Sequence, residues 1–328
     1  LGNVIAPKQV IDKFGAEILR MWVSASDYRD DVRISDNILK QLSDAYRRIR
    51  NTSRFILGNL SDFSPATDAV AADRMLEIDR FALHTLQSLV RRALKAYDAY
   101  EFHVIYHRLY NYCTVDLSSF YLDILKDRLY TSPPASVERR SAQTAMFIIL
   151  DAMARIMAPI MPFTAEEIWK HLPGAADKPD SIHLVLFPEP DAAFEDNGLA
   201  EKWETLIRVR AEVTKALEQA RADKVIGHSL DAAVTIGLSD ELYGVMADFR
   251  DDLRSILIVS RASITHGEIA DAYQGQETQG VWVQVQPAGG EKCQRCWVYD
   301  DTVGKIDDHP TICSRCQGAL SRMDLSDA

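Results

Sequence analysis

Four of the five cysteines in this chain of 328 residues form two Cys-x-x-Cys pairs near its C-terminal end. The first pair is Cys293 with Cys296 and the second is Cys313 with Cys316, with sixteen residues between the pairs. Two thiolates at this spacing can hold one metal ion at about 2.3 Å, and two such pairs complete a tetrahedral shell of four sulfurs. Because a closed shell leaves no position for water or substrate, the spacing predicts one structural zinc ion rather than a catalytic one.

The alternative, a pair of disulfides, requires an oxidising compartment. The sequence carries no charged-then-apolar leader with a cleavage site, so we expect a cytoplasmic protein with free thiols. The fifth cysteine, Cys113, lies in an apolar helical segment and is predicted to be a small buried residue.

Composition bounds the possible functions. Apolar residues make up 47% of the chain and charged residues 26%, as in ordinary globular proteins. No apolar run approaches the roughly 20 residues that a membrane-spanning helix needs. The net charge of −11 argues against indiscriminate coating of nucleic acid, so any RNA contact is expected to use local basic patches.

The pattern from residue 34 to 172 predicts a bundle of amphipathic helices. The first is expected over 36–57, with Ser35 as its cap and Gly58 at its end. Thr164 and Glu167 have the spacing of a capping box, which predicts a short helix after them. The other predicted helices span 79–97, 100–129 and 136–158.

The rest of the chain is more mixed. Residues 173–198, rich in proline and with one strand-like run at 183–187, are predicted to be a linker. A small α/β region is expected over 199–280, with a long helix followed by strand-like runs at 233–237 and 255–259. A further strand is expected near 281–285, shortly before the first cysteine pair, and this strand begins the predicted zinc-binding module, 281–328. The expected fold class is therefore mainly α, with a helical bundle, a small α/β region and a four-cysteine zinc module.

Several cations are candidates for RNA contacts. Arg47, Arg50 and Arg54 follow one another at helical spacing on a stripe away from the apolar face of their helix. The other candidates are Arg91, Arg92 and Lys95 on the next helix, and Arg295 and Trp297 beside the first cysteine pair. The alternative is that each cation pairs with a nearby carboxylate, and that Trp297 packs against the turn formed by the first cysteine pair rather than stacking on an unpaired base.

The sequence contains no recognisable catalytic centre. A glycine-rich phosphate loop, a nucleophile elbow and a His-Glu-x-x-His motif are all missing. From its residues alone the chain is predicted to be a binding protein, and no catalytic residue is assigned.

Several motifs resemble class I aminoacyl-tRNA synthetases. The opening Leu1-Gly-Asn-Val-Ile-Ala-Pro and Phe14-Gly-Ala-Glu-Ile-Leu-Arg-Met-Trp look like the segment that follows the Lys-Met-Ser-Lys-Ser loop of these enzymes. The bundle resembles their anticodon-binding domain in three further segments. These are Tyr46-Arg-Arg-Ile-Arg-Asn-Thr-Ser-Arg-Phe, Cys113-Thr-Val-Asp-Leu-Ser-Ser-Phe-Tyr-Leu-Asp and Ala158-Pro-Ile-Met-Pro-Phe-Thr-Ala-Glu-Glu-Ile-Trp. Ile226-Gly-His-Ser-Leu-Asp-Ala followed by the double Cys-x-x-Cys module is similar to the bacterial isoleucyl branch of the family.

The resemblance implies a function. Residues 1–33 would be a stem-contact segment, 34–172 the anticodon-binding bundle, and 199–280 a C-terminal junction domain. The complete enzyme would attach isoleucine to its tRNA using ATP, whereas this chain lacks the ATP and amino-acid site and is expected to be inactive by itself. Its implied partners are isoleucine tRNA and the catalytic and editing domains of the same polypeptide, with no membrane, and the chain is expected to be monomeric. There are two alternatives. The chain could be a helical bundle, stabilised by zinc, that has a structural role or binds proteins rather than RNA, or it could be the tRNA-binding module of a sibling class I synthetase.

Overall fold

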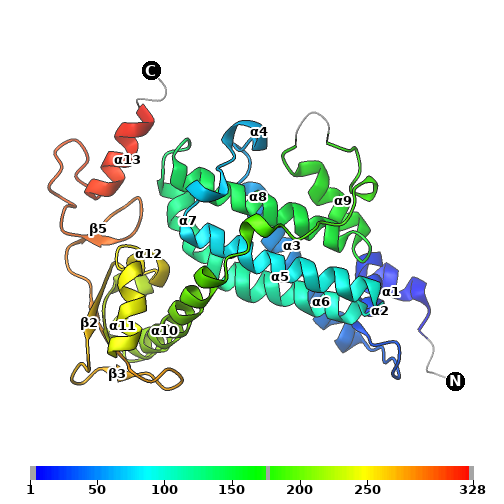
Figure 1. The fold of residues 1–328 in the computed structure, drawn as a ribbon, viewed down its shortest axis with the longest axis horizontal. Helices are drawn as coiled ribbons and strands as arrows, with labels where there is room; N and C mark the ends of the chain where they lie inside the picture. The colour runs from blue at the N-terminus through cyan, green and yellow to red at the C-terminus, as the bar shows by residue number, and fades with distance from the viewer. Residues whose placement is uncertain (1–4, 175–177, 325–328) are drawn as a thin grey trace. The chain divides into compact units, whose positions relative to one another are not determined.

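The computed structural model describes residues 5–174 and 178–324. The first four residues of the opening motif, three residues of the predicted linker and the last four of the predicted zinc module lie outside the described residues. The chain divides into two compact units (Figure 1). Unit 1 comprises Leu1–Leu125 and Pro134–Glu195, and unit 2 comprises Lys126–Pro133 and Asp196–Ala328.

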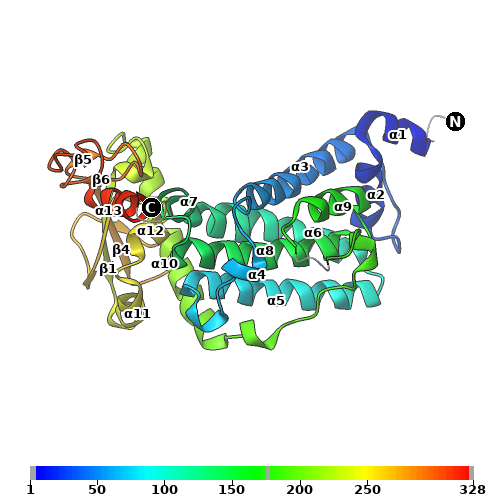
Figure 2. The ribbon, with the colours of Figure 1, turned by 90° about the horizontal axis from the view of Figure 1, so that it is seen from above.

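Unit 1 is a helical bundle, as predicted. Helix α5 packs against both α6 and α8, and α3 contacts α2, α8 and α9 (Figure 1 and Figure 2). The helices are α1 (Pro7–Phe14), α2 (Ala16–Ala25), α3 (Asp36–Gly58), α4 (Pro65–Asp68), α5 (Glu77–Asp98), α6 (Phe102–Asn111), α8 (Val137–Met157) and α9 (Pro162–His171). The π-helical segment η2 (Tyr112–Tyr121) continues α6 and is followed by α7 (Leu122–Thr131), whose residues from Lys126 onward belong to unit 2.

Local chemistry explains the start of α3 and the face that it buries. The hydroxyl of Ser35 accepts a hydrogen bond from the Ile38 N–H, which is the predicted cap. Leu39, Ile49 and Ile56 are almost fully buried, so the apolar face of the helix lies in the bundle core.

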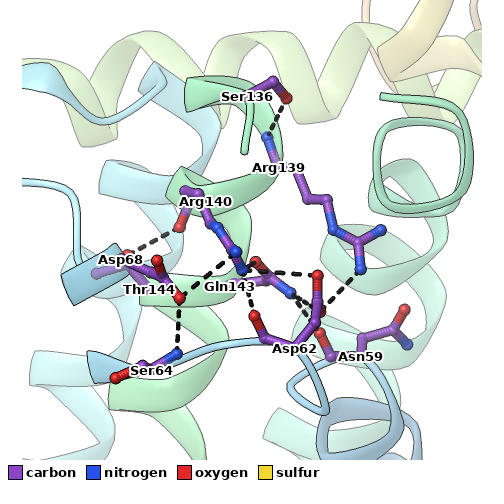
Figure 3. A network of polar contacts seen from close by, with 9 residues as sticks. All are labelled: Asn59, Asp62, Ser64, Asp68, Ser136, Arg139, Arg140, Gln143 and Thr144. Atoms are coloured by element: carbon purple, nitrogen blue, oxygen red, sulfur yellow. Dashed lines mark hydrogen bonds and ion pairs between the residues drawn. The ribbon is translucent and has the colours of Figure 1, made fainter. Parts of the chain in front are cut away.

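A polar network holds the loop after α3 to the start of α8 (Figure 3). The Asp62 carboxylate accepts hydrogen bonds from Arg139 at 2.9 Å and from the Gln143 amide at 2.7 Å. Arg140 donates to the Asp62 carbonyl and lies 3.5 Å from the Asp68 carboxylate. Burial raises the pKa of Asp62, but these donors and charges outweigh it and hold that pKa below its usual value. These arginines therefore serve the fold.

Unit 2 combines a long helix with a four-stranded sheet. Strand β1 lies centrally, parallel to β2 and antiparallel to β4, and β3 pairs with the other edge of β4. Helices α10, α11 and α12 contact one side of the sheet (Figure 1), while Thr235 and Ser263 share a hydrogen bond on its exposed side. The elements are α10 (Asn197–Ala222), β1 (Ala232–Leu238), α11 (Asp240–Met246), α12 (Leu253–Leu257), β2 (Arg261–His266), β3 (Tyr273–Gln274) and β4 (Val281–Pro287).

Strands β5 (Glu291–Lys292) and β6 (Tyr299–Asp300) and helix α13 (Ser314–Asp324) form the four-cysteine module. The predicted fold class, a bundle followed by a small α/β region and a four-cysteine module, is confirmed. Among the described residues, no helix combines the length and the apolar content needed to cross a membrane.

Three local predictions are wrong. The first three residues of the run at 255–259 form the end of α12 rather than a strand, because Leu253, Ile256 and Leu257 are buried together at helical spacing. The run at 183–187 has no strand partner in the described part of the chain and begins with a single 3-10 turn. Helix α9 starts at Pro162, before the predicted capping box, because Glu17 on α2 accepts hydrogen bonds from its first free N–H groups.

Candidate metal centre and nucleic-acid interface

The four cysteines of the two pairs lie in one cluster. Their sulfur atoms all lie within 4.8 Å of one another, and the thiols are free. Zinc–sulfur bonds of about 2.3 Å at tetrahedral angles place two ligand atoms about 3.8 Å apart. The Cys296 and Cys313 sulfurs are 3.8 Å apart. The cluster therefore has the donor set of a tetrahedral zinc site, with one sulfur pair already at the tetrahedral spacing.

Backbone hydrogen bonds build the cluster from the two pairs. The Trp297 N–H donates to the Cys293 carbonyl at 2.9 Å, and the Cys293 N–H donates to the Val298 carbonyl at 2.9 Å. This tight turn places Trp297 in the left-handed region with φ 65°. The Cys313 N–H donates to the Cys293 sulfur at 3.3 Å and so links the two pairs.

Both cysteine pairs carry an arginine at the same place, and both arginines bind the end of α7. Arg295 donates to the Thr131 carbonyl at 2.7 Å. Arg315 donates to the two carboxylate oxygens of Asp127 at 2.7 and 2.8 Å. The repeated pattern Cys-x-Arg-Cys could have revealed Arg315, which the sequence analysis did not single out.

The same arginines face the sulfur cluster. Hydrogen bonds from Cys316, from the Val298 backbone and from Arg315 lower the pKa of the Cys296 thiol to about 4, although its burial acts in the opposite direction. A thiolate is the form that binds zinc, and four thiolates on one Zn²⁺ carry a net charge of −2. With zinc bound, Arg295 and Arg315 would face the net negative charge of the cluster, Arg315 while it also pairs with Asp127.

The RNA candidates separate into two groups in the structure. Three of them have partners within their own unit: Arg47 forms an ion pair with Asp44 at 2.9 Å, Arg91 pairs with Glu195, and Arg295 binds Thr131. These contacts match the alternative in which a cation serves the protein itself.

The second group is exposed and free. The side chains of Arg50, Arg54, Arg92 and Lys95 form no hydrogen bond or ion pair among residues 5–174 and 178–324. Trp297 is 62% exposed rather than packed away. The first two cations share one face of α3 and the next two lie on α5. These side chains are available for a polyanion.

Family models match three parts of the chain. Residues 79–236 match the anticodon-binding domain of tRNA ligases, 290–318 match the zinc finger found in FPG and IleRS, and 1–35 match class I tRNA synthetases (I, L, M and V). The zinc-finger match and the four clustered cysteines together support one structural zinc ion.

Similar proteins are isoleucine-tRNA ligases. The chain is 52% identical to that of Syntrophotalea carbinolica over 98% of its own length and 34% of the relative. It is 48% identical to that of Geobacter sulfurreducens over the same shares, and 50% identical to that of Symbiobacterium thermophilum over 100% of this chain and 36% of the relative. The chain thus spans about a third of the length of these relatives.

The resemblance deduced from the sequence motifs is confirmed, because the family models and the relatives agree along almost the whole chain. This chain belongs to the isoleucine-tRNA ligase family, as a C-terminal segment that carries the anticodon-binding domain and the zinc finger.

Proposed function

We propose that this chain is the tRNA-binding portion of an isoleucine-tRNA ligase and that it recognises the anticodon stem and loop. The observation that carries the proposal is the match of residues 79–236 to the anticodon-binding domain of tRNA ligases. Arg50, Arg54, Arg92 and Lys95 support it, since they have no ion-pair partner among the described residues and can bind phosphates without first breaking an ion pair. The net charge of −11 on the chain makes such local cations the main source of attraction for RNA.

The complete ligase would activate isoleucine with ATP and transfer it to the tRNA, with the catalytic and editing domains outside this chain. By itself the chain would bind tRNA without aminoacylating it. In this proposal, residues 1–33 contact the stem, 34–172 form the anticodon-binding bundle, 173–198 connect it to a junction domain at 199–280, and 281–328 form the zinc-binding module. We also infer a monomeric protein in the cytoplasm, where aminoacyl-tRNA synthetases act.

Cys293, Cys296, Cys313 and Cys316 would hold the zinc ion as thiolates. The ion would fix the module that presents Trp297, and it would take no part in chemistry because all four positions are filled by sulfur. Phosphate contacts would set the register of the tRNA, and unpaired anticodon bases would be read by side chains of unit 2, because the A-form major groove is too narrow for them.

The test is the affinity of the chain for isoleucine tRNA, measured over a range of salt concentrations and compared with the same tRNA carrying a changed anticodon. We expect affinity that falls with salt and is weaker for the changed anticodon. Binding that ignores the anticodon would leave a general tRNA-binding module. Absence of salt-dependent binding would favour the non-RNA interaction bundle.

A further inference from the structure

The last turn of α7 is held by a side chain of the four-cysteine module. Residues 126–133 and the module belong to the same compact unit, unit 2. The last four carbonyl groups of an α-helix find no partner within the helix, so they need donors from outside it. The Ser132 N–H donates to the Arg128 carbonyl at 3.1 Å, and the Arg295 guanidinium donates to that of Thr131 at 2.7 Å. Arg295 is therefore part of the cap of α7.

Arg315 reaches the same helix end from the second cysteine pair. It donates to both carboxylate oxygens of Asp127 at 2.7 and 2.8 Å, and to the Thr131 hydroxyl at 3.4 Å. That hydroxyl donates in turn to the Asp127 carbonyl at 2.7 Å, and Thr131 is buried. A cation at the C-terminal end of a helix also interacts favourably with the helix dipole. The two arginines thus converge on one helix end.

Each guanidinium also faces a sulfur atom of the opposite cysteine pair. Arg295, from the first pair, faces the sulfur of Cys316, and Arg315, from the second pair, faces that of Cys296. Because these contacts are crossed, the position of each arginine depends on both cysteine pairs. Side chains that contact metal ligands orient those ligands, and replacing such side chains commonly lowers metal affinity about 10- to 100-fold.

The module has little besides metal binding to hold its arginines in place. Its buried core consists of Ile312 and three of the four cysteines. Four thiolates without a cation repel one another, whereas one zinc ion would fix all four sulfurs in a tetrahedral shell. Small sites of this kind couple metal binding to folding. The zinc-free chain is therefore expected to lose the turns that place Arg295 and Arg315 at the end of α7.

We propose that the zinc-loaded module is the C-terminal cap of α7: zinc at the four cysteines orders the last turn of α7 through Arg295 and Arg315, and that turn in return strengthens zinc binding. Arg295 and Arg315 are thereby positioning residues. The return effect follows from linkage, since two binding equilibria coupled in one direction are coupled equally in the other. This inference uses only contacts within unit 2 and is independent of the proposed function.

Amide hydrogen exchange of the full chain tests the first direction, with one equivalent of zinc and after zinc is removed by excess chelator under reducing conditions. The amides of residues 128–132 should exchange about 10- to 150-fold faster without zinc, the range for losing one hydrogen bond to a charged group. The amides of α5 are the internal reference and should keep their rates. Arg295→Ala/Arg315→Ala should show the fast exchange at 128–132 even with zinc bound.

The matched control is Arg322→Ala. Arg322 lies on α13 like Arg315, but it is exposed and donates to the Gly318 carbonyl within its own helix. This variant should keep the slow exchange of residues 128–132. Each variant is first shown to hold one equivalent of zinc and to retain the slow exchange of α5, which excludes global unfolding.

Asp127→Ala tests the return direction. Asp127 is not one of the clustered ligands, and Arg315 connects it to Cys296. Transfer of zinc to a chromogenic chelator should be about fivefold faster in Asp127→Ala, the factor expected for one partly exposed ion pair. It should be about 10- to 100-fold faster in Arg315→Ala, which also loses the contact with sulfur. Arg322→Ala should release zinc at the rate of the unaltered chain.

Two results would overturn the proposal. If residues 128–132 keep their protection when zinc is removed, the cap of α7 does not depend on the metal. If Arg315→Ala releases zinc faster while Asp127→Ala stays within twofold of the unaltered chain, Arg315 serves the sulfurs alone and the helix end does not support the metal. The zinc-free unaltered chain and Asp127→Ala decide the matter even where the double arginine variant fails to retain zinc.

Discussion

Replacing Cys293 with serine should remove zinc and unfold the four-cysteine module while the bundle stays folded. The buried core of this module consists of three of its cysteines and Ile312, with Val303, Leu320 and Cys296 packed against it. A fully buried aliphatic side chain contributes about 1.5–3 kcal/mol. A structural zinc ion contributes about 10–16 kcal/mol at neutral pH, so it is the largest single contribution to the stability of the module.

The size of the change in helicity follows from the structure. In the described part of the module the one helix is α13, Ser314–Asp324, whose 11 residues are about half the length of α3, α5 or α8 in unit 1. Far-UV circular dichroism should therefore fall only slightly in Cys293→Ser. Limited proteolysis should cut selectively after β4, and zinc measured with a chromogenic chelator should fall from one equivalent to none.

Cys113→Ala is the matched control. Cys113 is fully buried in η2, distant in sequence from the cluster, and its burial raises the pKa of its thiol. This variant should keep one equivalent of zinc and a protease-resistant module even where it lowers the stability of the bundle. Retention of zinc by Cys293→Ser, or loss of all helicity in one cooperative step, would refute the reasoning.

Three further predictions concern contacts within single units. Glu212→Gln should lower the free energy of unfolding, measured by urea denaturation, by about 2–4 kcal/mol. The fully buried carboxylate of Glu212 accepts hydrogen bonds from three backbone N–H groups, those of residues 276–278. A loss under about 1 kcal/mol would contradict this. A double-mutant cycle of Arg315→Ala and Asp127→Ala should give a coupling of about 1 kcal/mol rather than the value of a buried pair, because the side chains are 39% and 30% exposed. The pKa of Asp62 is lowered in the folded state, so ionised Asp62 contributes fully to stability above the unfolded pKa near 3.8, and this contribution is lost as the pH falls below 3.8. Arg139→Ala should therefore make acid unfolding, monitored by circular dichroism at 222 nm, less steep. An unchanged profile would exclude this contribution.

The features predicted well from the sequence are those set by local chemistry. The start of α3 follows from a hydroxyl that caps its first turn, and its buried face follows from apolar residues at helical spacing. Each pair of sulfurs in the four-cysteine cluster follows from its two-residue gap, and the repeat of that spacing predicts that the two pairs share one ion.

The features that were missed depend on distant partners. The start of α9 is decided by Glu17, a residue far away in sequence whose carboxylate replaces a local cap. The segment at 255–259 is rich in β-branched residues, but its burial with Leu253 selects a helix that ends at Leu257 and is capped by Ile258 in the left-handed region. Local propensity gives way to tertiary packing in both cases.

Charge pairing explains why sequence reasoning could nominate the RNA candidates but could not rank them. A helical stripe reveals that arginines are exposed, whereas their partners come from other segments. Arg91, for example, meets Glu195, which is distant in sequence. Such pairs are visible only in the folded chain.

The distinction between paired and unpaired cations has a thermodynamic consequence. A cation already paired with a carboxylate must give up that partner, or carry its negative charge along, when it approaches a phosphate, so its net gain is small. An unpaired cation such as Arg54 or Lys95 exchanges only water and bulk ions, and it gives the full counterion contribution to binding. In a chain with a net charge of −11, cations without a carboxylate partner among the described residues should therefore contribute most to polyanion binding, and paired ones such as Arg47 should contribute least. The binding surface therefore depends on where the fold places no carboxylate beside an arginine, as well as on where the sequence places the arginines.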